Sequence, residues 1–247
     1  MNLMRKMSWF RGVGRVDIKA APARKHGIRR RIVEFCCGHE SLIGQRAPAD
    51  TDVVRLTIDD DLTTDAGLAK ALAAVSDPDV PTLLFGALPC TGGSPYQHLN
   101  WYRGEKTRAK IREHRRIFKK LWKNFELVAE ACIAAGGKVA IEWPRNCTYW
   151  KLFRVRQFIR RHDLHEYKLD GCMYNLRSKV KQKYGKLLTK PWSIYSNCDE
   201  FWRMANTCNH VDRACTHVKT EGPDTKMTEG YTVEMADAIH MCWSRHA

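Results

Sequence analysis

A cysteine, a serine and a glutamate stand where this sequence could carry out covalent chemistry. Cys90 follows Pro89 at the end of the apolar stretch "TLLFGALPC", and Ser94 comes four residues later. Glu142 ends a second apolar stretch, "KVAIE". A thiolate is a strong nucleophile, and a carboxyl group beside a substrate can hold it and handle a proton. The alternatives are a small buried thiol for Cys90 and a salt bridge for Glu142, since a lone acid is costly to bury.

Two further loops carry residues suited to ligand binding. Gly38 follows the apolar stretch "RIVEFC", and a glycine there lets a ligand approach the backbone. A following helix would offer free N–H groups at its N-terminus. The acids at 59–61 follow "DVVRLTI" and could bind ribose hydroxyls. A tight turn at the glycine, and a solvated turn or helix cap at the acids, are the alternatives.

Alternating strand and helix patterns must position these loops. Strands are predicted at 31–36, 52–58, 82–88, 138–143, 164–169 and 191–196, and helices at 63–75, 106–135, 149–162 and 232–243. This alternation predicts an α/β fold with a mostly parallel sheet and helices on both faces. Ligands bind at the carboxyl ends of such strands. The four loops at 37–41, 59–61, 89–97 and 142–146 should therefore share one edge.

The chain is strongly basic, which favours a polyanionic partner. Its 247 residues carry a formal net charge of +15, and DNA or RNA is the partner class that fits. Ten Lys/Arg and two acids lie between 103 and 123, beside the proposed site. A phosphate-backbone track is favoured there over an ordinary solvated face. The predicted nucleic-acid contacts are Arg103, Lys106, Arg108, Lys110, Arg112, Arg115, Arg177, Lys179 and Lys190.

The N-terminal segment and the cysteines bear on the compartment. Residues 1–31 hold ten Lys/Arg and one acid, which predicts a disordered basic arm. A nucleic-acid-contacting tail, a nuclear signal and an organelle transit peptide remain open. Ten cysteines without an apolar secretory segment favour a reducing compartment, so we expect an intracellular protein, with the nucleus favoured. No apolar run approaches a membrane span, so no membrane partner is expected.

Together these residues resemble the class I S-adenosylmethionine-dependent methyltransferases, and among them the C5-cytosine methyltransferases. Pro89-Cys90 with Ser94 resembles the family's Pro-Cys-x-x-x-Ser loop, whose cysteine is the nucleophile. Glu142 resembles the glutamate that holds the cytosine, and 34–38 resembles the Asp-x-Phe-x-Gly start of the methyl-donor loop. The resemblance implies a Rossmann-like methyltransferase sheet and S-adenosylmethionine as cofactor. The donor contacts it implies are Glu34, Phe35, Cys37, Gly38, Ser41, Asp59, Asp60 and Pro89.

The resemblance covers about 32–197 and resumes near 228. "PCTGGSPYQ", "IEWP" and "KPW" also resemble methyltransferase-like segments of retroelement-type polyproteins. His39 and Glu40 stand where the family has its second glycine and a neighbour of it. About thirty residues replace the family's large target-recognition region. A partner protein or a fused domain would therefore supply target recognition.

The implied reaction is methyl transfer to carbon 5 of a cytosine, in DNA more than in RNA. Cys90 would add to carbon 6 and Glu142 would hydrogen-bond the ring, after the base has flipped out of a duplex. Tyr96 and Trp143 would stack beside that base. One alternative is a nucleic-acid-binding protein of the same fold without catalysis, which Glu40 favours. The other is transfer to an exocyclic amine, because "SPYQ" resembles the loop of amino-methyltransferases.

A compact Cys/His set marks a further segment. The predicted organisation is a basic arm at 1–31, a methyltransferase-like domain at 32–197, a Cys/His-rich segment at 198–228 and a C-terminal helix at 229–247. Thiolate and imidazole ligands suit tetrahedral Zn²⁺. Surface histidines and partly buried thiols are the alternative. The candidate zinc ligands are Cys208, His210, Cys215 and His217.

Overall fold

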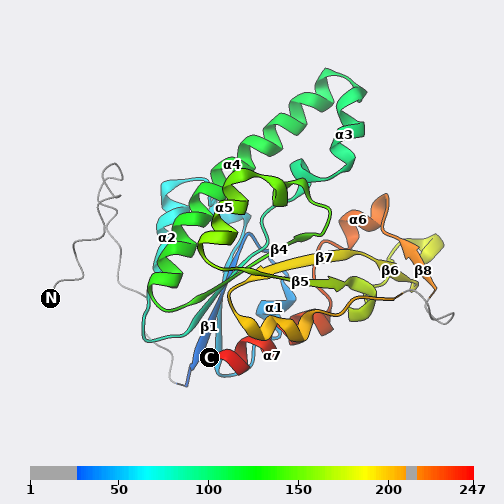
Figure 1. The fold of residues 1–247 in the computed structure, drawn as a ribbon. Helices are drawn as coiled ribbons and strands as arrows, with labels where there is room; N and C mark the ends of the chain where they lie inside the picture. Colours follow the sequence, from blue (N-terminus) through cyan, green and yellow to red (C-terminus); the bar gives the residue numbers. More distant parts are fainter. Residues whose placement is uncertain (1–26, 210–215) are drawn as a thin grey trace.

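A six-stranded sheet in the order β2-β1-β3-β4-β7-β5 forms the centre of the protein (Figure 1). The structure is a computed structural model and describes residues 27–209 and 216–247. β1 pairs in parallel with β2 and β3, and β3 pairs in parallel with β4. β7 runs antiparallel to both β4 and β5. The predicted mostly parallel α/β sheet is thus confirmed. The strands are β1 (Arg30–Phe35), β2 (Thr51–Leu56), β3 (Thr82–Gly86), β4 (Lys138–Pro144), β5 (His165–Asp170) and β7 (Pro191–Ser196).

Helices cover both faces of the sheet (Figure 1). α2 (Asp65–Val75), α4 (Glu105–Ala134) and α5 (Phe153–Arg161) pack on one face, and α1 (Leu42–Gln45) and α7 (Val233–His246) on the other. Each face has its own cluster of buried apolar side chains. Every residue of β3 is buried, as expected for a central strand covered on both faces.

The long helices begin and end where local chemistry dictates. The Thr64 hydroxyl accepts a hydrogen bond from the backbone N–H of Gly67 and caps α2. Beyond α4, Gly136 has a φ of 86°, a conformation that favours glycine. The apolar positions that recur at three- and four-residue spacing along α4 are all buried: Ile111, Phe118, Leu121, Trp122, Phe125, Val128 and Cys132.

The prediction of a single helix at 149–162 is wrong in its first part. A 3₁₀ turn, η5 (Thr148–Lys151), comes first, Leu152 is extended, and only then does α5 begin. Tyr149 stacks on Phe118 with ring centroids 3.6 Å apart. This packing fixes the turn against α4, and tertiary contact overrides the helical periodicity of the sequence.

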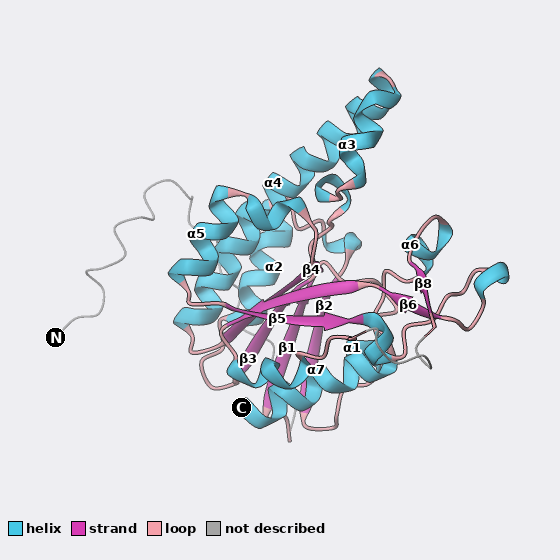
Figure 2. Ribbon diagram, turned by 45° about the vertical axis from the view of Figure 1, so that its right-hand side comes forward, coloured by secondary structure: helices cyan, strands magenta, loops and turns pink. Residues whose placement is uncertain are grey.

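Several short elements lie at the edge of the sheet (Figure 2). β6 (Leu187–Thr189) and β8 (His217–Lys219) form a small parallel sheet beside α6 (Pro223–Met227). The predicted Cys/His-rich segment also contributes the 3₁₀ stretch η8 (Asp199–Met204), whose Phe201 is fully buried under the main sheet. Among the described residues, no helix is both long enough and apolar enough to cross a membrane.

Candidate functional site

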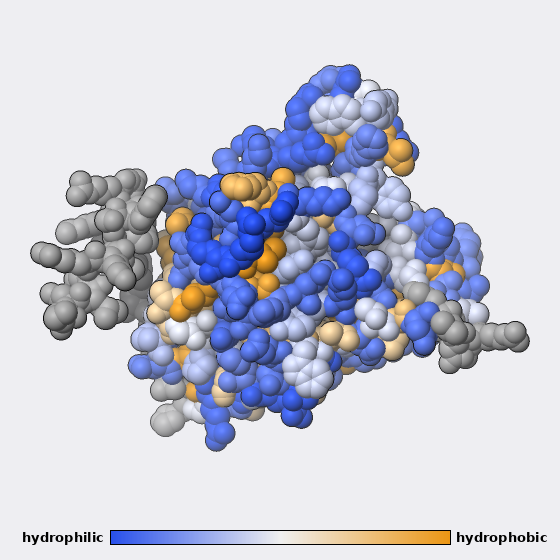
Figure 3. All heavy atoms as spheres, in the orientation of Figure 1, coloured by the Kyte–Doolittle hydropathy of each residue, from blue (hydrophilic) through white to orange (hydrophobic). Residues whose placement is uncertain are grey.

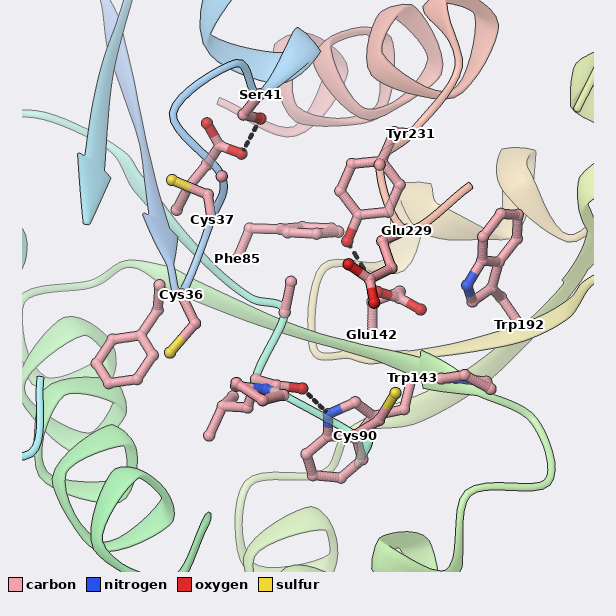
Figure 4. A pocket seen from close by; sticks show the side chains of 18 of the residues that line it. Cys36, Cys37, Ser41, Phe85, Cys90, Glu142, Trp143, Trp192, Glu229 and Tyr231 are labelled. Atoms are coloured by element: carbon pink, nitrogen blue, oxygen red, sulfur yellow. Dashed lines mark hydrogen bonds between the residues drawn. The ribbon is translucent and has the colours of Figure 1, made fainter. Parts of the chain in front are cut away.

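A cavity of about 570 Å³ lies at the carboxyl ends of β1, β3 and β4. The chain runs from β1 outward to β2 and then returns to the other side of β1 to form β3. Ligands bind at such reversals of strand order in open α/β sheets. The volume is in the range of small-molecule sites. In Figure 4, Glu142, Glu229 and Tyr231 face one another across the middle, with Cys90 on one side and Ser41 on the other.

Loops from three separate strands bring predicted site residues to this cavity. The loop after β1 supplies the proposed donor contacts, the loop after β3 supplies Cys90, and β4 supplies Glu142. These residues meet because the carboxyl ends of the parallel strands share an edge. Their chemical roles remain predictions. The predicted residues in the cavity wall are Glu34, Phe35, Cys37, Gly38, Ser41, Pro89, Cys90, Glu142 and Lys190.

Three of the predicted catalytic and donor-binding residues, Asp59, Asp60 and Ser94, lie outside the cavity wall. The Asp60 carboxylate accepts a hydrogen bond from the backbone N–H of Thr57 at 2.6 Å and pairs with Lys70. Asp60 therefore caps a turn after β2, and Asp59 on the same turn is exposed. Ser94 ends the 3₁₀ turn that follows Cys90. Contact of these side chains with a donor or base stays a prediction.

The glycine-rich turn after Cys90 is required by packing. A Cβ on Gly92 would lie 2.4 Å from the Tyr149 hydroxyl oxygen, and a Cβ on Gly93 would lie 2.7 Å from the same ring. The Arg115 guanidinium donates a hydrogen bond to the Gly92 carbonyl at 3.1 Å. The turn that carries Cys90 is thus fixed against α4 and η5.

Glu142 is buried, and among the described residues only one of its two carboxylate oxygens accepts a hydrogen bond. The Tyr231 hydroxyl donates a hydrogen bond to Glu142 Oε2 at 2.8 Å, while Oε1 has no hydrogen-bond partner among the described residues (Figure 4). Burial raises the pKa of Glu142 to about 7, against the lowering effects of Tyr231 and Lys190. Near neutral pH this carboxyl group can therefore either give or take a proton.

Cys90 is half-buried and is a protonated thiol at rest. Burial, followed by the negative charge of Glu142, raises its pKa to about 11. Lys190 acts in the opposite direction from the cavity wall, where its ammonium lies 4.9 Å from the Trp192 ring centroid. A protonated Glu142 would remove the charge that opposes thiolate formation.

The other end of the cavity is formed by the loop after β1. Burial raises the pKa of Glu34 to about 7, and the Ser41 hydroxyl donates a hydrogen bond to Glu34 Oε1. Glu34 Oε2 has no hydrogen-bond partner within the described part of the chain. At Gly38 an added Cβ would meet nothing within 4 Å, so this backbone borders open space. The loop starts at Cys36, whose φ of 68° is uncommon for a residue other than glycine.

Acidic side chains outnumber basic ones in the cavity wall. A wall of this composition suits a ligand that carries positive charge. The acids are Glu34, Glu40, Glu142 and Glu229, and the bases are Lys190 and Lys226.

Sequence reasoning missed two important wall residues and misjudged a third. Tyr231 and Glu229 come from the chain before α7, where the sequence offers only a weak likeness in "EGY". Trp143 is 1% exposed and its indole N–H donates to the Leu88 carbonyl at 2.7 Å. The expected stacking of Trp143 on a base is therefore wrong, because its ring is part of the aromatic core. Tyr96, by contrast, is 65% exposed, and its stacking on a base stays a prediction.

A basic helical arm, distinct in sequence from the basic segment predicted at 1–31, extends beyond the body of the protein. It consists of α3 (Tyr96–Asn100), the 3₁₀ turn η4 (Trp101–Arg103) and the N-terminal half of α4, and its surface is mainly hydrophilic (Figures 1 and 3). Glu105 pairs with both Arg108 and Arg112, so one acid serves two cations. Arg112 and Arg115 each lie 5.9 Å from the Trp101 ring centroid. The predicted contacts at 103–115 all belong to this arm.

The remaining predicted nucleic-acid contacts lie near the cavity. Arg177 and Lys179 line a second cavity of about 410 Å³, which shares Gly230 and Tyr231 with the first. Lys190 lies in the wall of the first cavity itself. The structure thus places Lys190 where it can act on Cys90.

Two of the four predicted zinc ligands lie together. Cys208 Sγ is 3.8 Å from His217 Nε2, and Cys172, which sequence reasoning missed, completes a group whose ligand atoms are within 4.8 Å of one another. His210 and Cys215 lie outside the described residues. No local spacing in the sequence connects Cys172 with the other two, because it follows β5.

Three comparisons with known proteins give no relative of this chain. No protein-family model, no curated protein and no solved structure matches it. The function is therefore argued from the chemistry and geometry of the cavity.

Proposed function

We propose that this protein transfers a methyl group from S-adenosylmethionine to carbon 5 of a cytosine in nucleic acid, with DNA favoured over RNA. The observation that carries the proposal is the meeting of Cys90, Glu142 and the loop at 34–41 around one cavity. These residues come from three strands and lie where the strand order reverses. The order of the sheet also supports a Rossmann-like fold.

The loop after β1 fits the methyl donor. S-adenosylmethionine carries a sulfonium and an ammonium group, and the acidic wall suits both charges. Glu34 Oε2 is free to accept a hydrogen bond, and Gly38 borders open space that a ligand can fill. When bound, the donor supplies an electrophilic methyl group. The residues that would hold it are Glu34, Phe35, Cys37, Gly38 and Ser41.

Cys90 and Glu142 would activate the cytosine together. Cys90 Sγ forms a bond to carbon 6, and the ring electrons become available at carbon 5. Glu142 Oε1 gives a proton or a hydrogen bond to the ring nitrogen, while Tyr231 holds Oε2. Lys190 stabilises the thiolate. After methyl transfer, water takes the carbon 5 proton, the electrons of that C–H bond re-form the carbon 5–carbon 6 double bond, and Cys90 Sγ leaves as a thiolate.

The basic arm would hold the nucleic acid beside the cavity. A base inside a duplex must flip out before Cys90 can reach it. Tyr96 and Tyr102 on the arm are exposed, and aromatic side chains stack on unpaired bases. The surrounding Lys and Arg side chains would neutralise phosphates.

Covalent trapping on 5-fluorocytosine tests this reaction. The fluorine at carbon 5 blocks the final elimination, so we expect a donor-dependent adduct between the full chain and a DNA or RNA oligonucleotide that contains it. The adduct should vanish in Cys90→Ala and persist in Cys132→Ala, which changes a thiol buried between α4 and β3. If folded protein forms no adduct on either nucleic acid, the proposed reaction is wrong.

The raised pKa of Cys90 favours a second candidate, a nucleic-acid-binding protein without catalysis. Glu40 beside the donor loop points the same way. Calorimetry with S-adenosylmethionine separates the two, because the second candidate predicts nucleic-acid binding without donor binding. Methyl transfer to an exocyclic amine is less well supported, since Ser94 and Tyr96 of the "SPYQ" loop do not line the cavity.

A further inference from the structure

Three metal-binding side chains from separate parts of the chain meet beside the small sheet. Cys172 lies on the 3₁₀ turn η6 (Gly171–Tyr174) after β5, Cys208 follows η8, and His217 is the first residue of β8. Their ligand atoms lie within 4.8 Å of one another, and Cys208 Sγ is 3.8 Å from His217 Nε2. Zn–S and Zn–N bonds of about 2.3 and 2.0 Å place S and N about 3.5 Å apart at a tetrahedral angle. The group therefore needs little movement to bind the ion.

The backbone holds these positions independently of any ligand. The Cys208 N–H donates a hydrogen bond to Asp170 Oδ2 at 2.9 Å, and the Asp170 N–H donates to the Asn206 carbonyl at 3.0 Å. Cys172 is 7% exposed on the turn that directly follows Asp170. His217 is held by the pairing of β8 with β6. Preorganised ligands of this kind are typical of a site rather than of chance proximity.

We propose that Cys172, Cys208 and His217 bind a structural zinc ion. Two thiolates and one imidazole are the donors that zinc prefers, and structural sites take four protein ligands. Zinc binding also drives deprotonation of the thiols. The inference is independent of the proposed methyl transfer, because none of the three residues lines the main cavity.

The ion would secure one wall of that cavity from a distance. The chain that leaves β8 passes through α6 and then supplies Glu229 and Tyr231 to the wall. Its other buried anchor is Asp224, which accepts hydrogen bonds from the Ser178 hydroxyl at 2.8 and 2.9 Å. Zinc would thus tie β8 to β5 and keep Tyr231 against Glu142 without touching a substrate.

Metal analysis of the full chain tests the site. Protein produced in zinc-supplemented medium and desalted should contain about one zinc per chain by mass spectrometry. Cys172→Ser, Cys208→Ser and His217→Ala should each lose it. Cys90→Ser and His165→Ala should keep it, because neither residue belongs to the group.

A spectroscopic measurement covers variants that fail to fold. Wild-type protein produced with Co²⁺ should show thiolate-to-cobalt charge transfer and the strong visible bands of a tetrahedral site. Folded wild-type protein with neither zinc nor these bands would overturn the proposal and leave a simple thiol–imidazole contact. Bound zinc without the 5-fluorocytosine adduct would support the zinc site and reject methyl transfer. The adduct without bound zinc would support methyl transfer and reject the zinc site.

Discussion

Burial raises the pKa of the Cys90 thiol most, and the charges of two neighbours adjust it further. Glu142 raises the pKa of the thiol and Lys190 lowers it. In protein without ligands, Glu142→Gln should therefore speed alkylation of Cys90 by iodoacetamide at pH 8 to 9, and Lys190→Gln should slow it. Mass spectrometry of the Cys90 peptide measures the rate. Lys179→Gln is the control, since that lysine lines the second cavity rather than the one that contains Cys90. An unchanged rate in Glu142→Gln would show that the two groups do not interact.

Two buried carboxyl groups should make stability fall as the pH rises. The pKa values of Glu34 and Glu142 are raised from 4.5 to about 7, so the folded protein holds both protons more tightly than the unfolded chain. The free energy of unfolding should fall from about pH 5 to pH 7 and then level off, by up to about 3 kcal/mol for each group. Urea denaturation at a series of pH values measures this.

The matched variants attribute the pH effect to individual groups. Glu142→Gln should remove its share of the fall, because the amide does not ionise. Glu113→Gln on the exposed side of α4 should leave the fall in place. A slope unchanged by both Glu142→Gln and Glu34→Gln would mean that neither carboxyl group titrates as described.

At the scale of elements, two glycines that follow strands differ in the space around them: Gly92 after β3 is tightly packed, and Gly38 after β1 is not. Gly92 has no room for a Cβ beside Tyr149, so Gly92→Ala should lower the free energy of unfolding by about 1 to 3 kcal/mol. Gly38 borders open space without a positive φ, so Gly38→Ala should change stability by less than about 1 kcal/mol. Because Gly38 lines the cavity proposed for the donor, donor affinity should still fall. Denaturation and calorimetry together check both variants, and full donor affinity in Gly38→Ala would place the donor elsewhere.

Elements with a long periodic pattern could be predicted, and short ones could not. β1, β3 and β4 follow from buried apolar runs, and α4 follows from a helical stripe. β6, β8, α3 and α6 span three to five residues each, too few for a period to show. Strand ends placed Cys90 and Glu142 together, because parallel topology fixes that edge. Tyr231 and Cys172 reach their sites only through tertiary packing, which local sequence does not record.

At the scale of the whole molecule, a mostly parallel sheet is joined to a C-terminal segment that completes its cavity. The sheet supplies Cys90, Glu142 and the loop after β1, and the segment supplies Glu229 and Tyr231. The arm follows the Cys90 loop along the chain and is fixed to it through Arg115. A nucleic acid held by the arm would therefore be presented to the cavity rather than to the outer faces of the helices.

The net charge of +15 should make nucleic-acid binding strongly dependent on salt. Each phosphate contact contributes about 0.9 to the slope of log affinity against log salt on duplex DNA, so Lys106→Gln with Lys110→Gln should lower that slope by up to about 2. Binding of S-adenosylmethionine should not change, because both lysines lie on the arm and outside the cavity wall. Fluorescence anisotropy between about 50 and 200 mM salt measures the slope. Arg116→Gln is the matched control, since that guanidinium is already paired with Glu113. An equal loss in the control, or an unchanged slope in the double variant, would move the phosphate track away from this face of α4.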